Sequence, residues 1–198
     1  MEERIEEILN YWFAPPAEDE ERPSGKELWF TKSAKTDRTI ERKFGRLVDK
    51  AKAGTLDGWA STARGRLALI ILLDQFNRNI NRDSKEMYDG DAKALALCLD
   101  GLDEGMDQEL LTLERAFFYM PCVHAEDVDA QMAGVEVFTE LRDQASPEQR
   151  AVCEDFLKHA EQHRDIVERF ERFPHRNAIL DRQSTPEESA WLQQSGNL

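Results

Sequence analysis

The sequence predicts an all-α protein. Apolar residues recur at helical spacing in nearly every segment, and no segment alternates with period two between turn signals. Short linkers containing proline, glycine or capping residues separate the segments, which favours antiparallel helical hairpins. The 198 residues suit one domain or a tightly joined pair. Because no low-complexity linker divides the chain, we expect a single domain over residues 1–198.

The first expected helix has one clear apolar face. Ile5, Ile8, Leu9 and Trp12 share that face, and Pro15 follows it as a stop signal. The acidic stretch from Glu18 to Arg22, followed by Pro23, is then expected to form a loop.

Two helices should follow this loop. Ser24 is expected to cap a short helix through Phe30. Thr36 or Asp37 is expected to cap a longer helix, which Gly54 ends.

Residues 64–79 are expected to form the central helix. They are apolar on all sides from Leu67 to Leu73, as in a buried helix. This is the longest apolar run of the chain, and it is too short to cross a bilayer.

Further helices are expected in the second half. Asp91 should start one that ends at Gly101 or Gly105, and Pro121 should end the next. Residues 126–141 then continue the helical pattern.

The last two helices have the same start signal. Ser146-Pro147 and Thr185-Pro186 each place a capping residue before a proline suited to the first helical position. Helices are therefore expected from Pro147 to about Phe170 and again from Pro186.

Charge and composition exclude several classes of protein. The net charge of −14 and a pI near 4.8 repel phosphate, so neither nucleic-acid nor anionic-membrane binding is expected. The acidic N-terminus lacks a secretory signal, and the odd number of widely spaced cysteines is typical of free thiols in a reducing cytosol. A cytoplasmic location is expected, with core positions for Cys98, Cys122 and Cys153.

Two hexapeptides that contain arginine and amide side chains are the main functional signal. Residues 74–79 read Asp-Gln-Phe-Asn-Arg-Asn, and residues 172–177 read Arg-Phe-Pro-His-Arg-Asn. Both abut strongly apolar segments, where charged and amide groups are rarely found unless paired or used. Pro174 should end the preceding helix and present His175, Arg176 and Asn177 on a bend.

Histidines interrupt the apolar face of the helix before the second hexapeptide. His163 shares a face with Phe156, Ala160 and Val167, and His159 lies one turn earlier. A core histidine and a site residue are both consistent with this pattern. A metal ion held by the two imidazoles is a weaker alternative, because no third ligand is evident and H-E-x-x-H is absent.

A similar mixture of polar and apolar residues begins the helix after Pro121. Asp127 and Gln131 extend its apolar stripe backwards, and His124 and Glu126 precede it. Acidic residues are also favoured at a helix N-terminus for electrostatic reasons, which is the structural interpretation of Glu126 and Asp127.

The arginines allow two interpretations. Asp74 and Arg78 are four residues apart and can pair along one helix, and Arg115 and Tyr119 share a face of the helix expected to end at Pro121. In one interpretation the arginines pair with carboxylates, among them Glu114, and lock helices together. In the other, some of them bind a small anion in an open pocket.

The chain resembles a bacterial family known as domain of unknown function 924 over nearly its whole length. The resemblance is carried by residues 11–13, 29–30, 69–82, 114–127, 131, 159–163 and 169–182. Its central motif is similar to D-Q-F-P-R-N, with Asn77 in the proline position. Asn81 stands where the family tends to show tyrosine, Glu171 where it shows glycine, and Ala125 where it shows serine. The resemblance implies a right-handed, tetratricopeptide-like helical superhelix and no established activity.

Three functions compete at this point. The first is a cytosolic small-anion binder or enzyme, in which His175 or His163 acts as acid and base and Glu126 orients it. The second is a tetratricopeptide-like module that binds a peptide or partner helix, with Trp12, Trp29, Trp59 and Trp191 as candidate contacts. The third is a domain whose polar motifs only lock helix packing. No cofactor is identified, and the expected ligand-binding residues of the first function are Asp74, Arg78, Arg82, Arg115, Tyr119, His124, Asp127, Gln131, Arg172, Arg176 and Asn177.

Overall fold

The computed structural model describes residues 2–17 and 22–195, and over these residues it is helical without any strand. The all-α prediction is therefore confirmed. Most of the expected acidic loop, residues 18–21, lies outside the described residues. Backbone contacts divide the chain into an N-terminal unit (residues 1–82 and 86–121) and a C-terminal unit (residues 83–85 and 122–198). The single domain and the tetratricopeptide-like superhelix stay predictions.

The N-terminal unit is built around an aromatic core. The Trp12 ring contacts the rings of Phe76 and Phe117 edge-on, with 5.5 Å between centroids in each pair, and Phe44 stacks on Phe76 at 4.8 Å. These rings come from four separate helical elements, so burying them holds distant segments together. Its elements are α1 (Glu2–Phe13), α2 (Gly25–Phe30), α3 (Ala34–Lys52), η1 (Asp57–Ser61), α4 (Ala63–Ile70), η2 (Ile71–Phe76), α5 (Asn77–Ile80), η3 (Lys85–Tyr88, which begins in the C-terminal unit), α6 (Asp91–Asp103), η4 (Met106–Glu109) and α7 (Thr112–His124, which crosses the boundary after Pro121).

The expected central helix spans α4, η2 and α5 and contains a π-helical turn. All residues of η2 are buried, and the backbone N–H of Asn77 donates to the carbonyl of Leu72, five residues earlier. Such turns inside α-helices are frequent at functional sites. Here the turn carries Asp74, whose side chain is wholly buried.

In the N-terminal unit, the expected cap of α3 was wrong, and of the two glycines expected to end α6, Gly105 does so. Ser33 caps α3 by accepting from the Thr36 N–H, because the Asp37 carboxylate is occupied by Arg82. Gly105, with a φ of +68°, follows α6, whereas Gly101 lies inside that helix.

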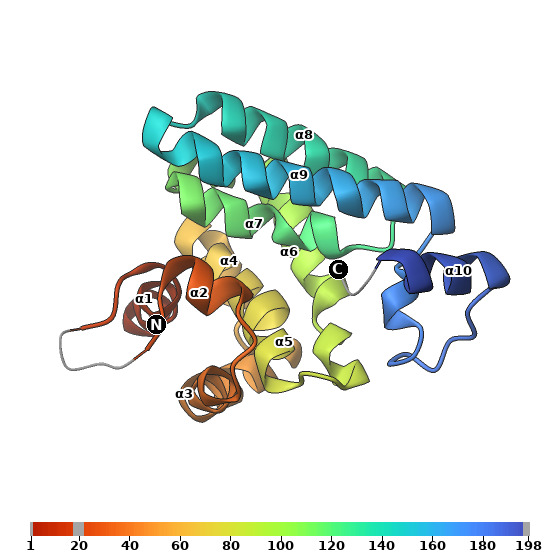
Figure 1. Ribbon diagram of the computed structural model, residues 1–198. Coiled ribbons are helices and arrows are strands. Elements are labelled where there is room, and N and C mark those ends of the chain that lie inside the picture. The colour runs from red at the N-terminus through yellow and green to blue at the C-terminus, as the bar shows by residue number, and fades with distance from the viewer. Residues whose placement is uncertain (1, 18–21, 196–198) are drawn as a thin grey trace. The chain divides into compact units, whose positions relative to one another are not determined.

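The C-terminal unit contains the helical hairpin of α8 and α9, which lie side by side in Figure 1. Phe138 of α8 stacks on Phe156 of α9 with 5.8 Å between ring centroids. Its elements are α8 (Val128–Gln144), α9 (Pro147–Phe170), η5 (Pro174–Arg176) and α10 (Pro186–Ser195). Both helices that were expected to start at a proline do so.

Pro121 does not end its helix, contrary to the prediction. A proline lacks one backbone donor, and α7 nevertheless continues to His124. Side chains then satisfy three carbonyls at its end: the Gln131 amide donates to those of Val123 and Ala125 (both 2.7 Å), and Arg176 donates to that of His124 (2.8 Å).

Candidate functional site

The predicted site residues divide between the two units, and each set is described separately. The convergence of the two hexapeptides on one hollow stays a prediction. Asp74, Arg78, Arg82, Arg115 and Tyr119 lie in the N-terminal unit, whereas His124, Glu126, Asp127, Gln131, His163, Arg172, His175, Arg176 and Asn177 lie in the C-terminal unit.

Arg78 joins the π-helical turn to the start of α6. Its Nη2 donates to Oδ1 of Asp74 (3.2 Å) and to both carboxylate oxygens of Asp91 (2.7 and 2.8 Å). Burial acts to lower the pKa of Arg78, but the two carboxylates outweigh it and raise that pKa above its ordinary value. The guanidinium therefore stays charged inside a two-carboxylate clamp. The expected pairing of Asp74 with Arg78 is confirmed.

Asn79 at the end of the first hexapeptide and Arg82 just after it both bind a carboxylate of α3, that of Asp37. Arg82 donates through Nε and Nη2 to the two oxygens of Asp37 (2.8 and 2.9 Å), and Asn79 donates to Oδ1 of the same carboxylate (2.8 Å). Burial opposes ionisation of Asp37, but Arg82 and Asn79 prevail, so the net pKa of Asp37 is lowered.

The side chains of Asn77 and Asn81 are in contact. Asn81 Nδ2 donates to Asn77 Oδ1 at 2.7 Å, and Asn77 Nδ2 donates to the carbonyls of Glu86 and Met87 (2.9 and 3.0 Å). The buried side chain of Asn77 thus links Asn81 to the backbone of η3.

Arg115 and Tyr119 share a face of α7, as expected, together with a buried partner that the sequence did not reveal. Arg115 Nε donates to the Tyr119 hydroxyl (2.9 Å), which in turn donates to Asp107 Oδ2 (2.5 Å). Burial and the Asp107 carboxylate raise the pKa of Tyr119. No local pattern distinguishes Asp107 from the exposed acidic residues Asp103 and Glu109 around it.

Glu126 is held by an arginine, where a histidine partner had been expected. Its two oxygens accept from Arg182 Nη1 (2.6 Å) and Nη2 (2.8 Å), and Oε1 also accepts from the Phe173 N–H (2.8 Å). Burial raises the pKa of Glu126, but these donors outweigh it and the net pKa is lowered. Asp127 caps α8 by accepting from the Ala130 N–H, which fits its structural interpretation.

The second hexapeptide is tied to α10 through Glu188. Arg172 donates to both oxygens of this buried carboxylate (2.6 and 2.8 Å), and Asn177 and the Thr185 N–H also donate to it. These donors, Arg172 first, lower the pKa of Glu188 to about 2. The capping-box spacing of Thr185 and Glu188 is the sequence signal that identifies this residue.

The chain's four histidines all lie in the C-terminal unit. The rings of His159 and His163 are 4.1 Å apart, and those of His163 and His175 lie 5.1 and 5.4 Å from the Phe173 ring. Burial first, then His159, His124 and His175, lowers the pKa of His163 to about 2. His163 is therefore neutral at pH 7. Because the His159 carbonyl can only accept, the proton of His163 lies on Nδ1 (3.0 Å).

No side chains in the described part of the chain form a group of three or more His, Cys, Asp or Glu residues that could hold a metal ion. Nor is any described helix both long and apolar enough to cross a membrane.

A basic cavity lies in the N-terminal unit, and none of the predicted site residues is among its lining residues. Its volume is about 690 Å³. Arg22 donates to the Ala14 carbonyl at one wall (3.0 Å), and its guanidinium lies 4.9 Å from the centre of the Tyr11 ring. The ammonium of Lys43 lies 5.3 Å from the same ring. The cavity is lined by Tyr11, Arg22, Pro23, Glu27, Thr31, Ser33, Lys35, Thr36, Thr39, Arg42 and Lys43.

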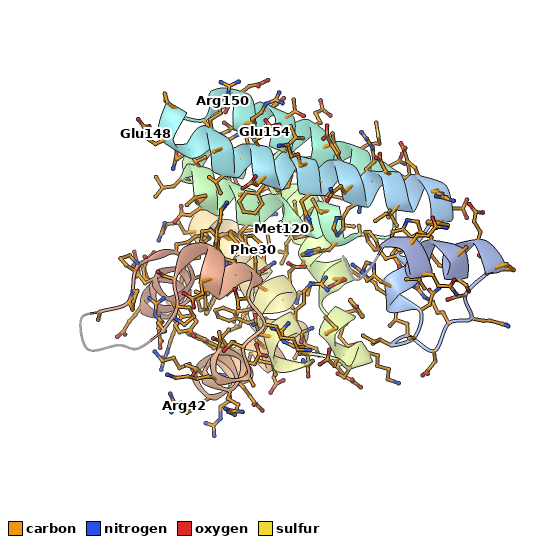
Figure 2. All side chains as sticks on the ribbon, viewed as in Figure 1. Phe30, Arg42, Met120, Glu148, Arg150 and Glu154 are labelled. Carbon is orange, nitrogen blue, oxygen red and sulfur yellow. The ribbon has the colours of Figure 1, made fainter. Side chains whose placement is uncertain are left out.

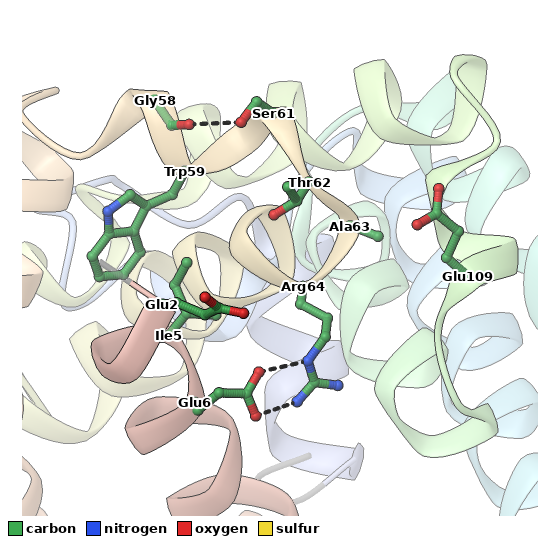
Figure 3. A pocket seen from close by; sticks show the side chains of 10 residues that line it. All are labelled: Glu2, Ile5, Glu6, Gly58, Trp59, Ser61, Thr62, Ala63, Arg64 and Glu109. Atoms are coloured by element: carbon green, nitrogen blue, oxygen red, sulfur yellow. Dashed lines mark hydrogen bonds and ion pairs between the residues drawn. The ribbon is translucent and has the colours of Figure 1, made fainter.

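A second cavity of about 460 Å³, also in the N-terminal unit, has the opposite charge (Figure 3). Its one arginine, Arg64, donates to both oxygens of Glu6 (2.7 and 2.8 Å) and also to Glu114 (2.8 Å). Glu2 and Glu109 add two further carboxylates to the lining. This charge disfavours an anion, and none of the predicted site residues lines this cavity either.

None of the four tryptophans is fully exposed. Trp12 and Trp59 are buried, and Trp29 and Trp191 are half-buried. Binding of a peptide or partner helix stays a prediction.

Comparisons with known proteins place the chain in a family. Residues 8–196 match the model of a family described as "Bacterial protein of unknown function (DUF924)". Among curated proteins no significant match was found. One solved structure, described as a protein of unknown function, ATU0120, from Agrobacterium tumefaciens, is 36% identical and superposes with a TM-score of 0.82, covering 98% of this chain and 99% of the other. The chain therefore belongs to the DUF924 family of bacterial proteins.

Proposed function

We propose that the protein binds small anions bearing carboxylate or phosphate groups in the basic cavity of the N-terminal unit. The observation that carries the proposal is the charge of the described lining residues, among which Arg22, Lys35, Arg42 and Lys43 outnumber the carboxylate of Glu27. In a chain of net charge −14, this is a strong local reversal of sign. A concave site with one sign of charge focuses the electrostatic potential on an oppositely charged ligand.

The position of the cavity adds to this attraction. Ser33 and Thr36, at the N-terminal end of α3, contribute to its lining. The 19-residue helix directs its positive dipole end towards this lining, which favours an anion. Hydroxyl groups of the lining provide uncharged donors beside the cations.

Three of the sequence-predicted arginines are already bound to carboxylates of the protein. Arg78, Arg82 and Arg172 each donate to protein carboxylates at 2.6–3.2 Å. A guanidinium held by two carboxylate oxygens already has the bidentate partner that an anionic ligand would provide.

The proposal is tested by thermal unfolding in inorganic phosphate at constant ionic strength. Ligand binding to the folded state should raise the melting temperature with phosphate concentration, and Lys35→Gln combined with Arg42→Gln should abolish the rise. Arg42 extends from α3 in Figure 2 and is exposed, so its truncation leaves the core intact. Arg46→Gln removes one positive charge from an exposed position of the same helix that does not line the cavity, and should retain the rise. A wild-type protein with no response, or a double variant that responds equally, would contradict the proposal.

A further inference from the structure

We infer that the protein self-associates through a contact in which helix α3 of one copy lies against helix α8 of another. The two helices carry exposed rows of opposite charge on the same chain. This inference goes beyond the proposed anion site and does not depend on it.

The basic row lies on α3. Its members are spaced four residues apart, so each lies about one turn beyond the last, and the row spans about 18 Å along the helix axis. All of them are exposed, and within the described part of the chain none of their side chains forms a hydrogen bond or an ion pair. Glu41 and Asp49 are exposed carboxylates of the same helix, and the cations outnumber them. The row consists of Arg38, Arg42, Arg46 and Lys50.

The acidic row lies on α8, a helix on which no exposed residue is a cation. It runs from Asp129 to Asp143, which is about 21 Å along the helix axis. The side chains of Asp129, Glu136 and Glu140 form no hydrogen bond or ion pair with other residues that the structure describes. Asp143 is bound by Arg142 at 2.8 Å. Three carboxylates of one helical face thus lack a partner within the chain.

The two rows match in length and in spacing. Glu136 and Glu140 are four residues apart, as are Arg46 and Lys50, so two helices lying side by side can pair successive charges. The net charge of −14 opposes the approach of two copies from a distance. Salt screens exposed charges beyond about 10 Å at 0.1 M, whereas paired groups in contact lie well within that length.

Met132 adds an apolar contact within the acidic row. Its side chain is 49% exposed, and that of Val128, one turn earlier, is 39% exposed. Arginine and lysine can cover apolar surface with their aliphatic stems while their charged ends reach carboxylates. Methionine and arginine are both enriched at protein interfaces. Because exposed ion pairs each contribute little, the association should be weak and sensitive to salt.

Sedimentation equilibrium over a series of protein concentrations measures the association. The wild-type protein should associate at about 50 mM salt, and its dissociation constant should rise about tenfold or more at about 300 mM salt, because salt screens the exposed pairs. A wild-type protein that stays monomeric up to about 1 mM, where even millimolar affinity is detectable, would overturn the inference.

Charge reversal in each row identifies the two surfaces. Arg46→Glu with Lys50→Glu, and separately Glu136→Lys with Glu140→Lys, should each raise the dissociation constant about tenfold or more, because like charges then face each other. The two variants should associate again when mixed, since α8 of the first and α3 of the second are unchanged. A chain that carries all four changes should also associate, because the opposite charges are restored with their signs exchanged.

A matched control separates these pairs from net charge. Lys85→Glu with Lys158→Glu changes the net charge as much as the α3 variant does, at exposed positions outside both rows, and should retain the wild-type association. Circular dichroism checks that each variant is folded. Either row variant associating like the wild type, or a mixture and a fourfold variant that both stay monomeric, would refute the α3–α8 contact. Neither Arg46 nor Lys50 lines the basic cavity, so this result leaves the proposed anion site intact.

Discussion

Mild acid should destabilise the C-terminal unit through His163. In the unfolded chain this imidazole takes up a proton at its ordinary pKa of 6.5, whereas in the folded unit its pKa is lowered to about 2. A folded-state pKa below the unfolded one means that the stabilisation is complete above pH 6.5 and is lost as the pH falls.

The size of the effect follows from the unfolded chain. At pH 5 the unfolded imidazole is 1.5 pH units below its pKa, and each unit corresponds to about 1.36 kcal/mol, so the loss between pH 7.5 and pH 5 is about 2 kcal/mol. Burial also lowers the pKa of His159, which adds a loss of the same sign. The lowered pKa values of Glu126 and Glu188 act mainly below pH 4.5 and are thereby separated from the histidine effect.

Urea unfolding at pH 7.5, 6.5, 5.5 and 5, followed by circular dichroism, measures this loss, and hydrogen exchange of the α9 amides locates it. His163→Gln should flatten the dependence by about 2 kcal/mol, because its amide can still donate to the His159 carbonyl but does not titrate. Lys158→Gln, at an exposed position of the same helix, should keep the wild-type dependence. An unchanged slope in His163→Gln would show that the reasoning about His163 is wrong.

Three further perturbations test the packing. Glu171 follows α9 with a φ of +58°, so Glu171→Gly should raise the free energy of unfolding by about 1 kcal/mol in urea titrations, and no gain would show that the left-handed conformation carries no strain. A Cβ at Gly90 would lie 2.3 Å from the Leu73 carbonyl oxygen, so Gly90→Ala should lower the free energy of unfolding by about 1–3 kcal/mol or more; an unchanged melting temperature would contradict this close approach. A double-mutant cycle of Asn77→Ala and Asn81→Ala should give a coupling of about 0.5–1.5 kcal/mol from their mutual hydrogen bond, and strict additivity would exclude it.

Helix starts could be predicted where the chain carries its own chemical signal. Pro147 and Pro186 both begin helices, because a proline at the first helical position has a suitable φ and lacks only a donor that would be unused. Pro121 lies in the last turn of α7, and side chains from distant residues stabilise the carbonyls beyond it. The sequence around Pro121 holds no information about those partners.

Ion pairs could likewise be predicted only where the two partners lie close together in the sequence. The pairing of Arg78 with Asp74 follows from a spacing of four residues within a helix. Arg82 pairs with a carboxylate 45 residues away, and Arg182 with one 56 residues away, so neither choice follows from local spacing. The basic cavity escaped detection for a related reason: Arg22 and the cations of α3 come together only when α1, α2 and α3 are folded, and no hexapeptide marks them.

The uneven distribution of histidine and tryptophan supplies the protein with natural probes. Every imidazole belongs to the C-terminal unit, whereas three of the four indoles, those of Trp12, Trp29 and Trp59, belong to the N-terminal unit. Imidazole proton resonances therefore monitor one unit of unlabelled protein, and intrinsic fluorescence mainly monitors the other. Following both signals through a single denaturant series would reveal whether the two units melt together or in sequence.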